Sequence, residues 1–240
     1  MKVSFVATVK DAGEHLAPFL ESLAAQTRRP DEVVIVDGGS TDGTLERLRA
    51  VPGIRVVSSP GANIPRGRNL AVAEATHDII AVSDADCVLE PTWLERILVP
   101  IEAGADVAMG AYRPIATSLL QRAMAATNLP DPTDLREATF NPSARSLAFR
   151  RSALTAVGGW PEWLDVGEDM WVDLAWRRRG AVMRLARDAV VGWPLRGSLG
   201  ATWTQYRRYA RGAGRASRPS RRRAIRFATY AFLEIGRAHV

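Results

Sequence analysis

The stretch IIAVSDAD at residues 79–86 joins a short apolar run to two aspartates that are separated by a single residue. Residues 79–82 are apolar at every position, which is typical of a strand buried on both faces. Asp84 and Asp86 follow at the carboxyl end of that strand, the edge at which ligands bind in open α/β sheets. The stretch therefore predicts a buried sheet with a polar site at its edge.

The chain on both sides of this stretch alternates strand-like runs with amphipathic helical patterns. The expected strands are 3–8, 32–36, 54–58, 78–82, 106–112, 146–149 and 181–191. The expected helices are 16–26, one starting near 41–42, 65–75, 91–103, 152–157, 168–179 and 199–215. This alternation predicts βαβ crossovers, and hence a Rossmann-like α/β fold whose mostly parallel sheet carries helices on both faces. Residues 129–142, with three prolines, are expected to form a long functional loop.

Composition places the chain among ordinary globular proteins. Of its 240 residues 47% are hydrophobic and 24% are charged, so one folded domain is expected rather than a disordered chain. Cys87 is the single cysteine, which excludes an intramolecular disulfide and fits a reducing compartment. Neither a signal peptide nor an apolar run of roughly 20 residues is present. We therefore expect a soluble or peripheral protein of the cytoplasm.

The net charge of +6 is concentrated near the C-terminus. Residues 189–233 contain ten arginines and no acidic residue, whereas the rest of the chain is slightly acidic. Aromatic residues alternate with these arginines at Tyr206 and Tyr209. Such a local patch favours contact with an anionic partner over a surface built for nucleic acid. A solvated basic helix is the alternative.

Asp84 and Asp86 form the strongest chemical signal. Carboxylates at i and i+2 after a buried strand can both point at one cation, and Mg²⁺ or Mn²⁺ prefers such oxygen ligands. A metal ion held there would neutralise charge on a departing diphosphate. An aspartate-rich turn is the alternative, but the position of the two aspartates directly after this strand favours the metal site.

A second polar stretch, DGGSTDGT at residues 37–44, follows the expected strand 32–36. Asp37 is placed where an acid can hydrogen-bond a ribose or a base, while Ser40 and Thr41 suit a turn and a helix cap. The first strand is followed by ATVK at residues 7–10 and by no glycine-rich fingerprint. This excludes an NAD-type Rossmann site and a Walker A loop.

Two further stretches carry charges suited to catalysis. Arg66 and Arg68, at a loop–helix junction, could pair with a diphosphate, although a solvated helix start is the alternative. Glu168 and Asp169 follow Gly167 at the start of an expected helix, where acids also compensate the helix dipole. Because the histidines lie elsewhere in the sequence, a carboxylate is the expected general base.

These four elements, in this order, resemble family 2 glycosyltransferases of the GT-A fold, and the resemblance covers roughly residues 3–215. It implies that Thr8, Asp37 and Arg68 contact the nucleotide, and that Asp84 and Asp86 meet the metal ion and the diphosphate. It also implies that Asp169 deprotonates the acceptor, with Glu168 beside it.

The second half resembles the acceptor side of such enzymes. Trp160 and Trp163 could stack on sugar rings, with core packing as the alternative. QYRRY at residues 205–209 is similar to the Gln-x-x-Arg-Trp motif of processive members, with Arg208 matching the arginine and Tyr209 in place of tryptophan. That departure argues against processivity.

The resemblance implies an inverting transfer from a nucleotide-diphospho-sugar, with UDP as the expected nucleotide and Mn²⁺ or Mg²⁺ as cofactor. The acceptor would be a hydroxyl of a glycan or lipid-linked molecule of the bacterial cell envelope. The basic patch would then face anionic lipid at the inner face of the plasma membrane. A sugar-phosphate nucleotidyltransferase and a non-catalytic nucleotide- or sugar-binding module are the alternatives.

The expected organisation is one GT-A domain over residues 1–215. Residues 1–112 would be its nucleotide-sugar-binding half and 113–215 its acceptor half, followed by a basic segment at 216–233. Residues 234–240 resemble translated sequencing adapter, so we expect the natural protein to continue differently beyond Leu233.

Overall fold

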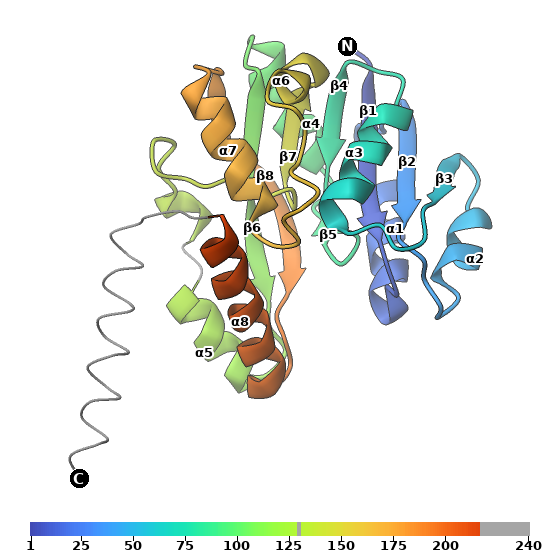
Figure 1. Ribbon diagram of the computed structural model, residues 1–240, viewed down its shortest axis with the longest axis vertical. Helices are drawn as coiled ribbons and strands as arrows, with labels where there is room; N and C mark the ends of the chain where they lie inside the picture. The colour runs from blue at the N-terminus through green and yellow to red at the C-terminus, as the bar shows by residue number, and fades with distance from the viewer. Residues whose placement is uncertain (129–130, 217–240) are drawn as a thin grey trace.

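The computed structural model describes residues 1–128 and 131–216, and Figure 1 shows its arrangement. The strands are β1 (Val3–Val9), β2 (Glu32–Asp37), β3 (Ile54–Ser58), β4 (Ile79–Val82), β5 (Val88–Leu89), β6 (Val107–Ile115), β7 (Leu147–Arg150) and β8 (Met183–Pro194). The α-helices are α1 (Leu16–Ala24), α2 (Thr44–Arg49), α3 (Ile64–Glu74), α4 (Trp93–Glu102), α5 (Leu119–Asn128), α6 (Arg151–Ala156), α7 (Glu168–Arg178) and α8 (Leu199–Arg215). Short 3₁₀ turns lie at Gly13–His15 and Pro132–Asp134.

The described strands form one eight-stranded sheet in the order β3-β2-β1-β4-β7-β6-β8-β5. β1, β2, β3 and β4 are parallel to their neighbours within this group, and β6 is parallel to β8. β7 runs antiparallel to both β4 and β6, and β5 runs antiparallel to β8. The mostly parallel sheet expected from the sequence is confirmed, with two antiparallel strands added.

Two hydrophobic cores lie on opposite faces of the sheet. One packs α1 and α4 against the sheet through side chains such as Phe19, Trp93 and Ile97. The other packs α3, α6 and α7 against it through side chains such as Val72, Leu154 and Trp176. In Figure 1, α3 and α7 cover the face toward the viewer. The alternation of side chains along each strand supplies both faces with apolar residues.

Local signals explain where the site-bearing helices begin. The side chain of Asn63 accepts a hydrogen bond from the amide of Arg66, and Pro65 occupies the first turn of α3. Gly167, at φ 91°, precedes α7 in the left-handed region that favours glycine. These two starts direct Arg68 and the acids of α7 toward the same end of the sheet.

Some elements differ from the expectation. Helix α2 begins at Thr44, later than 41–42, because the carboxylate of Asp42 accepts from the Thr44 amide within the preceding turn. The two-residue strand β5 and helix α5 were not predicted, because neither shows a clear periodic pattern of apolar residues. The boundary expected between residues 112 and 113 falls inside β6.

No described helix is long and apolar enough to cross a lipid bilayer. The basic arginines at 218 and 221–223, and the stretch 234–240, lie outside the residues that the structure describes.

Candidate active site

Arg68 is the centre of the site. Its side chain on α3 is 3% exposed and pairs with carboxylates from two other segments of the chain. Its guanidinium donates to Asp84 at 2.6 Å, to Glu168 at 2.8 Å and to Asp169 at 2.9 Å. The structure thereby joins three of the stretches singled out in the sequence, at the carboxyl end of β4 and the amino end of α7.

Asp169 is held by donors on both carboxylate oxygens. Its Oδ1 accepts from Arg68 and from the indole Nε1 of Trp160 at 3.1 Å. Its Oδ2 accepts from the amide of Ala144 at 3.0 Å and from the hydroxyl of Ser143 at 3.2 Å. The carboxylate is therefore fixed in position and is 20% exposed, so that a ligand can still reach it.

The carboxyl group of Glu168 has a raised pKa. Burial, followed by the charge of Asp169, raises the pKa of Glu168 to about 7, and the contact with Arg68 offsets only part of that increase. Glu168 is therefore partly protonated near neutral pH. A titrating group lies beside the expected base.

Asp84 and Asp86 lie in different environments. Burial opposes ionisation of Asp84, but the charges of Arg68 and Arg145 hold its pKa below the ordinary value. For Asp86, burial and the charge of Asp84 raise the pKa. Among the described residues its hydrogen-bond donor is the Cys87 thiol, at a long 3.7 Å. The nearby arginine charges offset only part of this increase in pKa, so the carboxylate of Asp86 is less compensated than that of Asp84.

A divalent cation fits this donor chemistry. Mg²⁺ and Mn²⁺ take oxygen ligands and are commonly held by one or two carboxylates together with substrate phosphates. Within residues 1–128 and 131–216 no cluster of three or more His, Cys, Asp or Glu side chains could form a complete protein site. A cation at this place could take an oxygen ligand from Asp86 and would need further ligands from outside the described residues.

Arg145 is a site residue that the sequence analysis did not single out. Its guanidinium lies 4.1 Å from the ring of Trp193 and 3.8 Å from Asp84. It donates to the hydroxyl of Tyr209 at 3.3 Å, whereas its Nε is buried without a hydrogen bond among the described residues. Only the antiparallel pairing of β7 with β4 reveals that this arginine adjoins Asp84.

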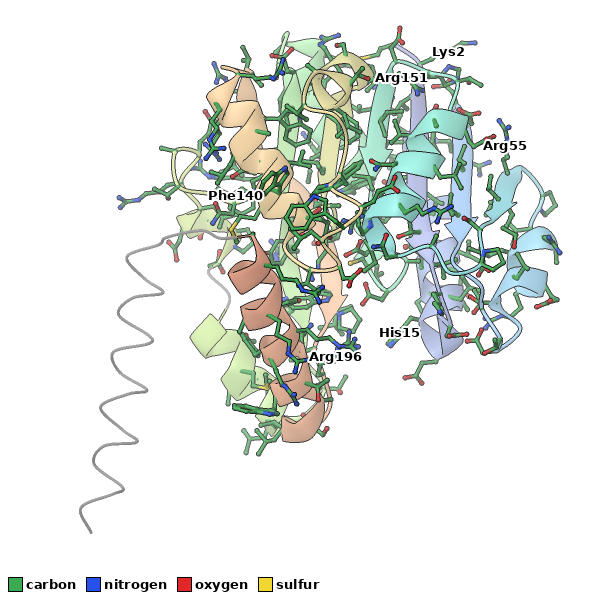
Figure 2. The ribbon with its side chains drawn as sticks, in the orientation of Figure 1. Lys2, His15, Arg55, Phe140, Arg151 and Arg196 are labelled. Carbon is green, nitrogen blue, oxygen red and sulfur yellow. The ribbon has the colours of Figure 1, made fainter. Side chains whose placement is uncertain are left out.

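Arg196 is a second basic residue at this site. Figure 2 shows it beside α8, on the side toward the N-terminal strands. Its charge, like that of Arg145, favours the ionised form of Asp86.

Three expected site residues share no hydrogen bond or ion pair with this cluster in the described part of the chain. Asp37 is fully buried, and its carboxylate accepts from the amides of Gly39 and Ser40 within its own turn. Thr8 is partly buried on β1. Arg208 is exposed on α8.

The two tryptophans expected on the acceptor side have different surroundings. Trp160 is 2% exposed and packs edge-on against Phe149, as the core-packing alternative expected. Trp163 is 55% exposed and packs edge-on against Trp171. Of the two, Trp163 retains a surface open to a ligand.

Comparisons with known proteins bear on the family and the fold. The family model described as Glycosyl transferase family 2 matches residues 4–157. The O-antigen chain rhamnosyltransferase RfbN of Salmonella typhimurium is 23% identical over 215 residues, which cover 80% of this chain and 66% of RfbN. The N-acetylglucosaminyl-diphospho-decaprenol L-rhamnosyltransferase of Mycobacterium tuberculosis is 38% identical over 77 residues, or 32% of this chain and 23% of that protein.

The crystal structure of S. aureus TarS 1-349 in complex with UDP-GlcNAc has the same fold. It superposes with a TM-score of 0.64 at 20% sequence identity, covering 82% of this chain and 60% of TarS 1-349. The GT-A fold expected from the sequence is confirmed. The chain spans between 23% and 66% of the length of these three proteins.

Proposed function

Because the chain belongs to glycosyl transferase family 2, we propose that it transfers a sugar from a nucleoside-diphosphate sugar to a hydroxyl of a glycan or lipid-linked acceptor. The observation that carries the proposal is the convergence of Asp84, Glu168 and Asp169 on Arg68. An acid at the end of β4 and acids at the start of α7 meet there, where a donor and an acceptor could be brought together. Membership of this family favours sugar transfer over the alternative of a sugar-phosphate nucleotidyltransferase.

A UDP-sugar is the proposed donor, with Mn²⁺ or Mg²⁺ as cofactor. The TarS complex named above contains UDP-GlcNAc, which supports a uridine nucleotide on this fold. Asp86, with Asp84 beside it, would hold the cation, which supplies positive charge for the departing diphosphate. Thr8 and Asp37 lie on the neighbouring strands β1 and β2, and their nucleotide contacts implied by family resemblance remain predictions.

Asp169 is the proposed general base. It would accept the proton of the acceptor hydroxyl while that oxygen attacks the anomeric carbon, and the bond from that carbon to the diphosphate oxygen breaks on the opposite face. Attack and departure on opposite faces would invert the configuration of the anomeric carbon. The hydrogen bonds from Ala144 and Trp160 would keep the carboxylate oriented during the transfer.

The names of two relatives support the proposed acceptor class. RfbN is described as acting on the O-antigen chain, and the mycobacterial protein as acting on an N-acetylglucosaminyl-diphospho-decaprenol. A glycan or a lipid-linked saccharide of the bacterial cell envelope is therefore the proposed acceptor, with Trp163 and Arg208 on its side. The protein would work at the cytoplasmic face of the plasma membrane, in contact with anionic lipid.

The donor site is tested by titrating UDP and GDP into the purified protein by calorimetry, with Mn²⁺ and with EDTA. We expect one nucleotide, UDP, to bind only with metal, and Asp86→Ala to lose that binding. Glu21→Ala, which removes an exposed acid from α1, is the matched control and should bind as the parent does. Absence of nucleotide binding by the folded parent protein would contradict the proposal and favour a non-catalytic module.

A further inference from the structure

Helix α8 carries three different faces. With about 100° of rotation per residue, one face turns toward the protein body. Its members, all at least partly buried, are Thr202, Gln205, Gly212 and Ala216. The hydroxyl of Thr202 lies 3.5 Å from the sulfur of Met124 on α5. The helix is thus docked along one side only.

A second face of α8 is apolar and exposed. Leu199 is 68% exposed and Trp203 is 71% exposed, and they fall with Tyr206 and Ala210 within about 60° around the helix axis. Leu119, at the start of α5, is 76% exposed. Gln121 of α5 donates to the carbonyl of Leu195 just before α8, so these apolar side chains belong to one end of the molecule. Figure 1 shows α5 and α8 together at its lower end.

The third face of α8 is basic. Its members follow the apolar stripe over roughly the next 100° of the helix and are Arg207, Arg208, Arg211 and Arg215, all exposed. The helix contains no acidic residue, and the sequence from 217 to 233 adds five arginines and no acid. An apolar stripe flanked by arginines complements a surface that is both anionic and apolar beneath.

We propose that the exposed stripe of α8, with Leu119 of α5, docks on the surface of an anionic lipid bilayer. Leu199 and Trp203 enter the boundary between headgroups and acyl chains, and the arginine face lies along the lipid phosphates. Exposed leucine and tryptophan have no use in a purely electrostatic contact, whereas they suit the apolar boundary of a bilayer. The proposal specifies the part of the chain that makes the membrane contact.

The docked face of α8 connects this surface to the active site. Gly212 packs against Val166, which directly precedes Gly167 and the acids of α7. Tyr209 accepts a hydrogen bond from Arg145, which adjoins Asp84. A bilayer on the outer side of α8 would therefore lie about one helix diameter, roughly 10 Å, from the loop that leads into the acids of α7. Under the proposed function, a lipid-linked acceptor would be presented close to Asp169.

The test is co-sedimentation of the full chain with vesicles of phosphatidylcholine alone or mixed with phosphatidylglycerol. We expect binding that requires phosphatidylglycerol. The variant Leu199→Gln/Trp203→Gln should weaken it about tenfold or more, since two large apolar side chains no longer enter the bilayer. Arg207→Gln/Arg211→Gln should weaken it about fivefold per arginine and reduce its dependence on salt.

The matched control is Val99→Gln/Val182→Gln, which removes two exposed apolar side chains from other elements and should bind as the parent does. Near-ultraviolet circular dichroism verifies that each variant is folded. Equal binding by the Leu199→Gln/Trp203→Gln variant would overturn the proposal and assign binding to the arginines after residue 216. A dimer lost in that variant, without vesicle binding by the parent, would assign the stripe to a second copy of the chain.

The vesicle test does not depend on catalysis. Failure of the proposed function appears as absent nucleotide binding in calorimetry, and failure of the membrane surface appears as absent vesicle binding, so the two results are distinguishable.

Discussion

Arg68 organises the site because one buried guanidinium donates hydrogen bonds to three carboxylates. Its contacts with Asp84, Glu168 and Asp169 join α3, the end of β4 and the start of α7. A planar fork of donors can serve several acids at once, which the ammonium of lysine could not reproduce. The same pairing reduces the repulsion among three adjacent acids in the folded state, and the raised pKa of Glu168 reflects the part that remains.

Replacing Asp169 by asparagine should separate catalysis from donor binding. Loss of the general base should lower the rate of sugar transfer by about 10²- to 10⁴-fold, while UDP binding in calorimetry changes little. Asp165→Asn is the control, because Asp165 is an exposed acid in the loop that precedes α7. An unchanged transfer rate in Asp169→Asn would show that another group accepts the proton.

The raised pKa of Glu168 should appear in the pH dependence of stability. The folded protein keeps this proton up to about pH 7, whereas the unfolded chain loses it near 4.5, so the folded state binds more protons in that window. The free energy of unfolding contributed by Glu168 is therefore fully present below 4.5 and is lost as pH rises through about 7.

Urea unfolding of the parent and of Glu168→Gln across this range tests the shift. The stability of the parent relative to the variant should fall by about 1 to 3 kcal/mol between the two pH values. Glu21→Gln, at an exposed position, should give a profile parallel to the parent. Parallel profiles for Glu168→Gln as well would contradict the raised pKa.

At the scale of elements, α8 approaches the loop before α7 so closely that a side chain would not fit. A Cβ on Gly212 would lie 2.1 Å from the carbonyl oxygen of Val166, whereas a Cβ on Gly214 would meet nothing within 4 Å. Close packing therefore requires glycine at position 212 but not at position 214 of the same helix.

Alanine at these two positions should have opposite effects. Gly212→Ala should destabilise the docked helix by about 1 to 3 kcal/mol through overpacking and should lower transfer activity. Gly214→Ala should stabilise α8 by about 0.5 to 1 kcal/mol, because alanine is the better helix former. Hydrogen exchange of the α8 amides measures both changes. Equal effects of the two substitutions would argue against the close packing.

At the scale of the whole molecule, one sheet runs through both expected halves. β7, from the second half of the sequence, lies between β4 and β6, and β6 crosses the boundary at residue 112. The residues proposed for the donor side and for the acceptor side are therefore held by the same hydrogen-bonded framework, which fixes their separation.

This continuity predicts a single cooperative unfolding transition. Far-ultraviolet circular dichroism and fluorescence from the buried tryptophans of both cores, such as Trp93 and Trp176, should give the same urea midpoint. A fragment of residues 1–112 should aggregate, since it exposes the apolar edge of β4 where β7 pairs. A soluble fragment with its own cooperative transition would show that the N-terminal half folds alone.

Local signals in the sequence were sufficient to predict the fold class and to identify most of the acids of the candidate site. The buried runs of β2 and β4, the helix starts at α3 and α7, and the aspartates after β4 are all determined within a few neighbouring residues. The boundaries expected for β3 and α8 agree with those observed. Short β5 and weakly patterned α5 carry too little local information to be recognised.

The composition of the site was decided only by tertiary structure. Arg68 and Asp169 are 101 residues apart in sequence, and Arg145 reaches the neighbourhood of Asp84 through the antiparallel pairing of β7 with β4. Strand order and helix docking depend on contacts between distant segments, which no local period encodes. The sequence by itself determined which residues were chemically suited to the site. The tertiary fold determined which of these residues are in contact, because one buried arginine forms hydrogen bonds with acids from separate elements.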